Sequence, residues 1–331
     1  MKKITISFSY TSLIISIILL MFLGFAASIL LSNREGNSQA TKDYSYKSSY
    51  SNYQFISPLL DCGEQNNSSN FYKYLKSDLK KLSEDLVERN EAQHISVYFR
   101  DLNNGPWVGI NEAEKFSPAS MMKVPLMIAY LKLAESDSEL LNRSIKIDSV
   151  HNTLEPNLPE EKSLDLDGDY LTIELIEKMI IDSDNYAASV LLQNINDHDL
   201  DLVYLDLGFQ PNEWKYGMKE NYMTVREYSS FFRVLYNASY LNRDMSELAL
   251  AILSQTNFHH GLKAGVGENV VVSHKYGERS ILGSQQLHDC GIIYHRNNPY
   301  LLCLMTRGSN FDKMQNVIAE ISELVYNTID K

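Results

Sequence analysis

The sequence predicts a mixed α/β domain of the α+β type, which consists of an antiparallel five-stranded sheet flanked by helices and an inserted all-helical lobe. Three observations lead to this prediction. Two short β-rich runs come early in the domain and three come late. The long stretch between them, from Ser120 to about Gln255, carries apolar residues at helical spacing. One amphipathic helix precedes the first β-rich run and another closes the chain, so helices are available to cover the sheet.

The N-terminal region is expected to be a membrane anchor. The residues from Ser12 to Leu31 are almost continuously apolar, and a helix of about 20 residues spans about 30 Å, the thickness of a bilayer's hydrocarbon core. Lys2 and Lys3 precede this span, which predicts that the basic end stays in the cytoplasm and the rest of the chain lies outside. We therefore expect residues 1–32 to form the transmembrane signal-anchor of a single-pass cell-membrane protein.

A cleaved signal peptide is the alternative for this region. The small residues at 26–28, Ala-Ala-Ser, could form a peptidase site, and the protein would then be secreted. The apolar run continues past them to Leu31, which favours a retained anchor. Residues 33–55 are rich in Ser, Tyr, Asn and charge without an apolar period, so we expect a flexible extracytoplasmic linker before a domain that covers 56–331.

Composition excludes several classes of function. Of 331 residues, 30 are Lys or Arg and 42 are Asp or Glu, so the basic excess that a nucleic-acid partner requires is missing. The eight His form neither an H-E-x-x-H pattern nor a paired site with Cys, so we expect no metal and no other cofactor. Three Cys allow at most one disulfide. Cys290 and Cys303 fall on two strands of one predicted hairpin, and we interpret both as small, buried apolar side chains.

The first elements of the domain follow one another from Phe71. Leu side chains at spacings of three and four predict an amphipathic helix over 71–90. Two β-rich runs follow, 94–101 and 106–110, and the turn residues Asn-Asn-Gly between them are typical of a hairpin.

The helical block and the late strands complete the expected fold. Five stretches of the block each carry an apolar stripe: 121–134, 172–181, 185–195, 224–236 and 245–253. The late β-rich runs are 270–275, 286–295 and 300–306. A final helix over 310–329 begins after Ser309 or Asn310, and either residue can cap it.

The segment Ser-Pro-Ala-Ser-Met-Met-Lys at 117–123 stands where the sheet pattern changes to a helix. We expect Ser120 in the first turn of that helix, with Lys123 three residues later on the same face. The Lys123 amine can then reach the Ser120 hydroxyl and take its proton, which creates a nucleophile. The helix N-terminus adds a partial positive charge and N–H groups that favour a developing anion.

Two further segments carry polar groups suited to the same chemistry. Ser183, Asp184 and Asn185 connect two predicted helices, where Ser183 could relay a proton and the Asn185 amide could hold a substrate carbonyl. Taken alone, this segment is better explained as a helix N-cap. Residues 275–277, Lys-Tyr-Gly, end a β-rich run, where a cation can hold a substrate carboxylate and Gly lets the backbone approach a ligand.

From Phe71 onward the chain resembles the serine β-lactamase and penicillin-binding protein superfamily, class A β-lactamases most closely, whose signature is S-x-x-K, then S-D-N, then K-T-G. The resemblance implies a β-lactamase/transpeptidase-like fold and an acyl-enzyme mechanism. It also implies roles for single residues: Ser120 as nucleophile, Lys123 and Ser183 in proton transfer, Asn185 and Lys275 with Gly277 in substrate binding, and the backbone N–H groups of Ser120 and Glu278 as the oxyanion hole.

The sequence departs from this pattern at the third motif. Tyr276 stands where the family has Thr or Ser, so a small hydroxyl is missing at the site for the substrate carboxylate. Glu278 places a negative charge beside that site, which disfavours an anionic ligand unless Arg279 neutralises it.

A further departure concerns turnover. The family's E-x-x-L-N motif, whose Glu activates the deacylating water, does not occur between 185 and 224, and neither Glu213 nor Glu220 is assigned its role. Without a positioned base, an acyl-enzyme at Ser120 forms but is hydrolysed slowly. We therefore expect a membrane-anchored, extracytoplasmic serine hydrolase that is acylated by β-lactams or peptidoglycan-type peptides. Two alternatives stay open: a D,D-peptidase-like penicillin-binding enzyme, and a non-catalytic domain that senses wall fragments or antibiotics.

Overall fold

The computed structural model describes residues 53–58, 69–103, 105–147, 164, 168–209, 221–281, 283–296 and 298–330. The expected membrane anchor and residues 33–52 of the expected linker lie outside these ranges. Within the ranges, no helix combines the length and the apolar character needed to cross a bilayer. The compact unit to which the described residues belong begins at Tyr53, three residues before the expected start of the domain.

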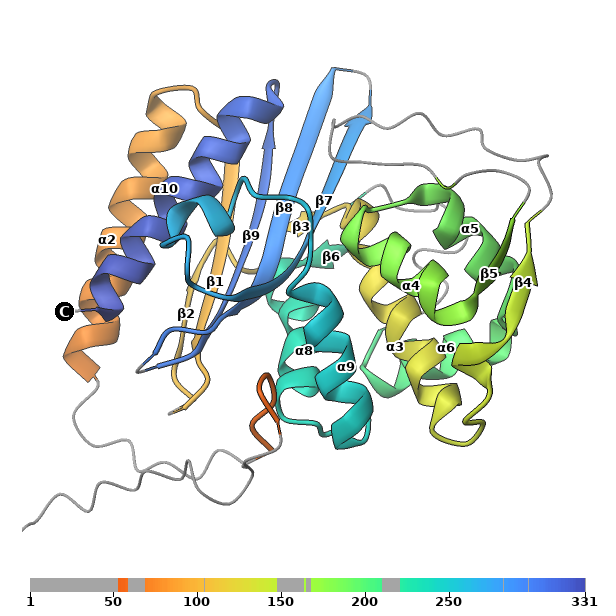
Figure 1. Cartoon of the computed structure of the whole chain (residues 1–331). Helices are drawn as coiled ribbons and strands as arrows, with labels where there is room; N and C mark the ends of the chain where they lie inside the picture. Colours follow the sequence, from red (N-terminus) through yellow and green to blue (C-terminus); the bar gives the residue numbers. More distant parts are fainter. Residues whose placement is uncertain are drawn as a thin grey trace, which may run out of the picture. The chain divides into compact units, whose positions relative to one another are not determined.

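A five-stranded antiparallel sheet forms the centre of this unit, in the order β2-β1-β9-β8-β7, and confirms the predicted fold class (Figure 1). The early hairpin of β1 (His94–Asp101) and β2 (Trp107–Ile110) pairs with β9 (Tyr300–Gly308). Strand β9 is buried on both faces, which explains its continuous apolar run. β8 (Ser284–Ile293) joins it to the edge strand β7 (Val272–Ile281).

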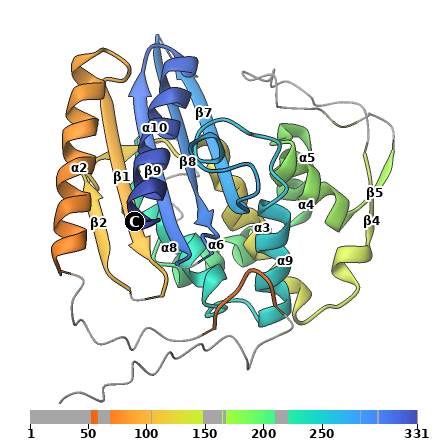
Figure 2. The same ribbon diagram turned by 60° about the vertical axis from the view of Figure 1, so that its left-hand side comes forward.

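Helices α2 (Ser69–Glu88) and α10 (Phe311–Ile329) cover one face of the sheet (Figure 2). Their apolar stripes face the strands because residues three and four apart share one side of a helix. Asn310 caps α10, as one of the two expected caps, and accepts a hydrogen bond from the Lys313 amide at 2.9 Å. The core on this face contains side chains of both helices and of the sheet, among them Leu75, Leu79, Phe99, Leu304, Val317 and Ile321.

The helical lobe packs against the opposite face of the sheet. The lobe contains α3 (Lys123–Ala134), α4 (Thr172–Ile181), α5 (Asn185–Asn194), α6 (Asp197–Asp206), α8 (Val225–Tyr236) and α9 (Arg243–Leu253). Helix α3 is buried on nearly all sides, which explains an apolar sequence without a single stripe. Helix α6 is missing from the sequence prediction because only Leu200, Val203 and Tyr204 are buried along it, while other apolar residues, Leu202 and Leu205, are exposed.

Two short strand pairs lie outside the main sheet. β3 (Lys115–Phe116) pairs with β6 (Met223–Thr224), and β4 (Ser144–Lys146) pairs with β5 (Asp169–Leu171). The sequence does not predict them because strands of two or three residues are too short to show an alternation. The β3–β6 pair adjoins the segment that carries Ser120, because β3 leads directly into that segment.

Residues Tyr53–Pro58, here called the strap, bind to α9. The Glu247 carboxylate accepts hydrogen bonds from three successive backbone amides of the strap, those of Gln54, Phe55 at 2.9 Å and Ile56 at 3.0 Å. The Ile56 side chain is buried in the core of the helical lobe. The strap is therefore part of the folded unit, although half of it falls in the stretch expected to be linker.

The sequence interpretation of two cysteines is right about their burial on neighbouring strands and wrong about their bonding. Cys290 of β8 and Cys303 of β9 are direct cross-strand partners with Cα atoms 3.9 Å apart, and they form a disulfide. Both lie in the core between the sheet and the helical lobe. The register of the two strands decides the outcome, because only directly opposed residues bring two sulfur atoms within bonding distance. Periodicity alone does not determine that register.

Candidate active site

The segment that carries Ser120 folds as a 3₁₀ turn, η2 (Ala119–Met122), and the α-helix begins only at Lys123. This corrects the expectation that Ser120 lies in the first turn of an α-helix. Ala119 has a φ of +51°, a left-handed value that costs a non-glycine residue about 1–3 kcal/mol and clusters at functional sites. The Ser120 side chain is partly exposed, and its carbonyl accepts a hydrogen bond from the Lys123 amide. The turn therefore presents Ser120 at the surface of the domain.

Ser183 is the meeting point of two lysines from distant parts of the chain. The Lys275 ammonium donates to the Ser183 hydroxyl at 2.9 Å, and Lys123 donates to the same oxygen at 3.2 Å. Lys123 also donates to the Ser183 carbonyl. All three side chains are buried, with exposures of 0% for Ser183 and Lys275 and 6% for Lys123. Two amines on one buried hydroxyl form a continuous path for protons.

Asp184 and Asn185 have separate tasks. Asp184 caps α5, since its carboxylate accepts hydrogen bonds from the Tyr186 and Ala187 amides at 2.7 and 2.9 Å. Burial raises the pKa of Asp184, while these amides and the charge of Lys123 act in the opposite direction. The Asn185 carbonyl oxygen accepts from Lys123 at 2.7 Å, and the Asn185 side chain is partly exposed. The N-cap interpretation therefore applies to Asp184 and not to its two neighbours.

Strand β7 meets the Ser120 turn at Gly277. A Cβ atom on Gly277 would lie 2.5 Å from the Pro118 carbonyl oxygen and 2.9 Å from the Met121 nitrogen, so only glycine allows this approach. The contact brings the backbone of the turn beside the strand. An oxyanion hole of the Ser120 and Glu278 amides requires this arrangement.

Lys275, Tyr276 and Glu278 differ in position from the sequence expectation. Lys275 lies in the middle of β7 and not at the end of a strand. It has no exposed surface, which does not match the expectation of a cation open to a substrate carboxylate. The Tyr276 ring stacks on Phe258, with centroids 4.2 Å apart, in the core on the α2–α10 side of the sheet. Tyr276 therefore does not occupy the place of the missing hydroxyl, and Glu278 is also largely buried.

The loop between α9 and β7 ties the second and third motifs together. Asn257 donates its side-chain amide to Asp182 at 2.6 Å, one residue before the S-D-N motif. Thr256 donates its hydroxyl to the His274 carbonyl at 2.8 Å, one residue before the K-Y-G motif. The sequence offers no signal for Thr256 or Asn257, because they belong to no motif and to no periodic stretch. Only the packing of the folded chain places them.

The sequence matches the model of the β-lactamase enzyme family over residues 75–329. The chain belongs to this family. A comparison with curated proteins finds no match.

Solved structures of this β-lactamase family and its relatives share the fold. TLA-1 extended spectrum β-lactamase is 19% identical with a TM-score of 0.66, covering 77% of this chain and 99% of that one. A PBP-A variant in an acyl-enzyme complex with penicillin-G is 20% identical with a TM-score of 0.64, covering 78% and 97%. A class A β-lactamase from Bacteroides cellulosilyticus is 19% identical with a TM-score of 0.65, covering 77% and 98%. At these identities the likeness concerns the fold.

Two glutamates that the sequence analysis considered for deacylation in this β-lactamase family member lie outside the described residues. Glu213 and Glu220 fall in the stretch 210–220, which the structure does not describe. The expectation of slow deacylation therefore rests on the absent E-x-x-L-N motif alone. Within the described ranges, no group of His, Cys, Asp and Glu side chains is arranged to hold a metal ion.

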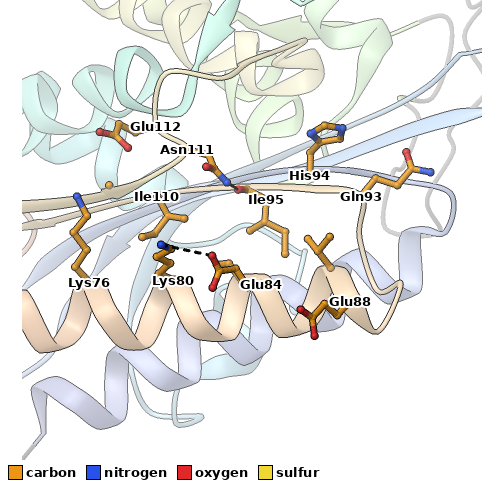
Figure 3. A pocket seen from close by; sticks show the side chains of 13 residues that line it. Lys76, Lys80, Glu84, Glu88, Gln93, His94, Ile95, Ile110, Asn111 and Glu112 are labelled. Atoms are coloured by element: carbon orange, nitrogen blue, oxygen red, sulfur yellow. Dashed lines mark hydrogen bonds and ion pairs between the residues drawn. The ribbon is translucent and has the colours of Figure 1, made fainter.

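A groove of about 550 Å³ lies away from the motifs, between α2 and the β1–β2 hairpin (Figure 3). The Lys80–Glu84 ion pair of α2 stands on one side of it at 3.7 Å. On the other side, the Asn111 amide donates to the Ile95 carbonyl at 2.9 Å. No residue of the three motifs lines this groove. The groove therefore takes no part in the chemistry of the candidate active site.

Proposed function

We propose that this chain is a serine hydrolase that forms an acyl-enzyme at Ser120 with a β-lactam or a peptidoglycan-type peptide. The observation that carries the proposal is the pair of contacts from Lys123 and Lys275 to the Ser183 hydroxyl, beside the turn that presents Ser120. An isolated motif occurs by chance, whereas two buried amines on one buried hydroxyl require partners selected from three separate segments. Membership of the β-lactamase enzyme family supports the same chemistry.

Acylation involves three proton transfers. Lys123, in its neutral amine form, takes the Ser120 proton while the serine oxygen bonds to the carbonyl carbon of the substrate. The resulting oxyanion is stabilised by the backbone N–H groups of Ser120 and Glu278. The C–N bond then breaks, and Ser183 gives its proton to the leaving nitrogen and regains one from a lysine. The Asn185 amide, which Lys123 holds at 2.7 Å, orients the carbonyl side of the substrate.

Deacylation by water is the slow step of the proposed cycle. A water molecule must lose a proton as it attacks the acyl carbon, and a positioned carboxylate accelerates that step. The E-x-x-L-N motif that supplies this carboxylate in class A β-lactamases does not occur in the sequence. The acyl-enzyme therefore accumulates, as in a penicillin-binding protein.

The proposed location is the outer side of the cell membrane, with the alternative of secretion after cleavage. The apolar segment from Ser12 to Leu31 supports an anchor or a signal peptide. The disulfide between Cys290 and Cys303 supports an extracytoplasmic domain, because disulfides persist in oxidising compartments and are rare in the cytosol.

Labelling with a fluorescent penicillin tests the proposal. Full-length chain in detergent is incubated with the probe, and covalent mass is located by intact-protein and peptide mass spectrometry. We expect one adduct on the peptide that contains Ser120, and none in the Ser120→Ala variant. Equal labelling of wild type and Ser120→Ala, or no labelling of folded wild type, would contradict the proposal.

The kinetics of a chromogenic cephalosporin separate the alternatives. Steady hydrolysis indicates a β-lactamase, and a single stoichiometric burst indicates the D,D-peptidase-like, penicillin-binding enzyme. Reversible binding without a covalent adduct indicates a sensing domain. We expect the burst, followed by slow release.

A further inference from the structure

Ser117 lies three residues before Ser120, and each of its polar groups is bound by a different side chain of the β7–β8 hairpin. Its amide donates to the Gln286 side-chain oxygen at 3.0 Å, and its carbonyl lies 2.9 Å from His288 Nε2. Its hydroxyl accepts from Arg279 Nη1 at 2.7 Å. Ser117 itself is buried. We call Gln286, His288 and Arg279 the Ser117 clamp.

The direction of the His288 hydrogen bond follows from its second nitrogen. The Thr306 amide donates to His288 Nδ1 at 3.2 Å, so Nδ1 carries no proton and Nε2 is the donor to Ser117. Burial lowers the pKa of His288 to about 4, and the charge of Arg307 acts in the same direction. The imidazole is therefore neutral near pH 7, with one donor and one acceptor, as this position requires.

Gln286 extends the clamp to a second segment. Its oxygen is fixed on the Ser117 amide, and its nitrogen donates to the Asn221 side chain at 2.9 Å. The next residue, Tyr222, donates its amide to the Phe116 carbonyl at 3.1 Å. Gln286 thus holds two segments at once, the one that leads into the Ser120 turn and the one that leads into β6.

The other end of the turn is also held. The Tyr228 hydroxyl of α8 donates to the Met121 carbonyl at 2.8 Å. Between Ser117 and Met121 lies the left-handed Ala119. A strained residue persists only where its surroundings over-determine its conformation, and the clamp at one end and Tyr228 at the other supply that restraint.

We propose that Gln286, His288 and Arg279 are positioning residues for acyl transfer, which hold Ser117 so that the Ser120 oxygen and the Ser120 N–H stay aimed at the substrate carbonyl. The proposal rests on the proposed function of Ser120. Its physical basis is that a displacement of about 1 Å at a reacting atom can slow a reaction by about 100-fold. The clamp consists of polar contacts to one residue, so it controls the geometry of the turn more than the stability of the fold.

The contact between Arg279 and the Ser117 hydroxyl allows a sharp test, because Ser117→Ala removes that hydroxyl and leaves the two backbone bonds of the clamp. We expect Ser117→Ala and Arg279→Ala each to slow acylation by a fluorescent penicillin by about 10-fold or more, with little change in the non-covalent dissociation constant or the melting temperature. The double variant is no slower than the slower single variant, since both changes remove one contact. Arg279→Lys, which can still donate, restores part of the rate.

Arg226→Ala is the matched control, because Arg226 is an exposed arginine that lies over the Trp107 ring and touches no residue of the clamp. It should be acylated at the wild-type rate. Wild-type acylation rates in Ser117→Ala and Arg279→Ala would overturn the proposal while the function at Ser120 stands. Additive losses in the double variant would also overturn it, because the two residues would then act by separate routes.

Amide hydrogen exchange keeps the two proposals distinguishable. The Met121 amide donates to the Pro118 carbonyl at 3.1 Å inside the turn, so its exchange reports the order of the turn without any substrate. We expect exchange of residues 118–123 to be about 5-fold faster in Ser117→Ala than in wild type or Arg226→Ala. If wild type is not acylated, the function at Ser120 fails, and unchanged exchange would then contradict the clamp as well.

Discussion

Two residues of the candidate site adopt left-handed backbone conformations, Ala119 with φ of +51° and Ser183 with φ of +56°. Neither is a glycine, so each costs free energy that the rest of the fold must compensate. Ala119 directs the turn before Ser120, and Ser183 directs its own hydroxyl toward two lysines. At these two positions the strained backbone fixes the direction of a hydroxyl group.

Two substitutions at Ser183 distinguish the loss of its hydroxyl from the relief of its backbone strain. Ser183→Ala and Ser183→Gly both remove the hydroxyl, and we expect either change to slow acylation by about 100-fold or more. Only glycine relieves the strain of the left-handed backbone. The free energy of unfolding of Ser183→Gly should therefore be about 1 kcal/mol higher than that of Ser183→Ala. Stopped-flow labelling and urea unfolding measure the two quantities. Equal stabilities of the two variants would show that Ser183 is not strained.

His288 predicts a pH dependence of stability. Its pKa is lowered by burial from 6.5 to about 4 in the folded state, so between these values the unfolded chain binds a proton that the native state does not. Stability from this group is therefore present above pH 6.5 and falls as the pH drops toward 4, by about 1.4 kcal/mol per pH unit. Urea unfolding at several pH values measures how steeply the free energy of unfolding falls between pH 6.5 and 4. The His288→Gln variant lacks the contribution of His288, so its slope should be smaller than that of wild type by about 1.4 kcal/mol per pH unit. The same slope in both proteins would contradict the assignment.

At the scale of the element, the strap shows how an irregular segment is held without secondary structure. One carboxylate, that of Glu247 on α9, accepts hydrogen bonds from successive backbone amides of residues 54–56. Backbone N–H groups that point in one direction form a site for an anion. The strap is therefore attached to the helical lobe by backbone contacts in addition to the buried side chain of Ile56.

Removing the charge of Glu247 should loosen the strap. We expect Glu247→Gln to lower the free energy of unfolding by about 1–2 kcal/mol, because hydrogen bonds to a charged acceptor are stronger than those to a neutral amide. Limited proteolysis should cut the variant faster between residues 53 and 58. Glu323→Gln, at an exposed glutamate of α10, is the control and should behave as wild type. Unchanged proteolysis of Glu247→Gln would show that the strap is held by its apolar contacts alone.

At the scale of the whole molecule, most of the sheet and of the helical lobe could be predicted from the sequence, because long elements show their period. The bounds of β1 and α4 agree with the prediction. The 3₁₀ turn at Ser120, helix α6 and the short strands could not be predicted, since each is decided by tertiary packing. The disulfide and the Ser117 clamp depend on the register between β8 and its neighbours, which a linear pattern does not contain. The candidate motifs could be identified from their order, and the expected pairing of Lys123 with Ser183 is confirmed by their contact at 3.2 Å.

The disulfide joins β8 and β9, the two strands of the last hairpin. Its loss should lower the stability of the whole fold. We expect the free energy of unfolding of the double variant Cys290→Ala/Cys303→Ala to be about 2–3 kcal/mol lower than that of oxidised wild type, because the crosslink restricts the unfolded chain. Wild type in reductant should match the double variant. Labelling of Ser120 under native conditions should persist in both. Identical stabilities of oxidised and reduced wild type would contradict the crosslink.

The contacts of Ser183 have a practical consequence. Its partners come from the start of α3 and the middle of the edge strand β7, so they meet only in a completely assembled molecule. In a chain whose β7–β8 hairpin has not docked, Ser183 lacks its Lys275 partner and the proposed oxyanion hole lacks the Glu278 amide, so the proposed function predicts that a penicillin does not label it. If Ser120 is acylated as proposed, the amount of covalent adduct per mole of protein measures the fraction of correctly folded molecules, in a cell as well as in a purified sample.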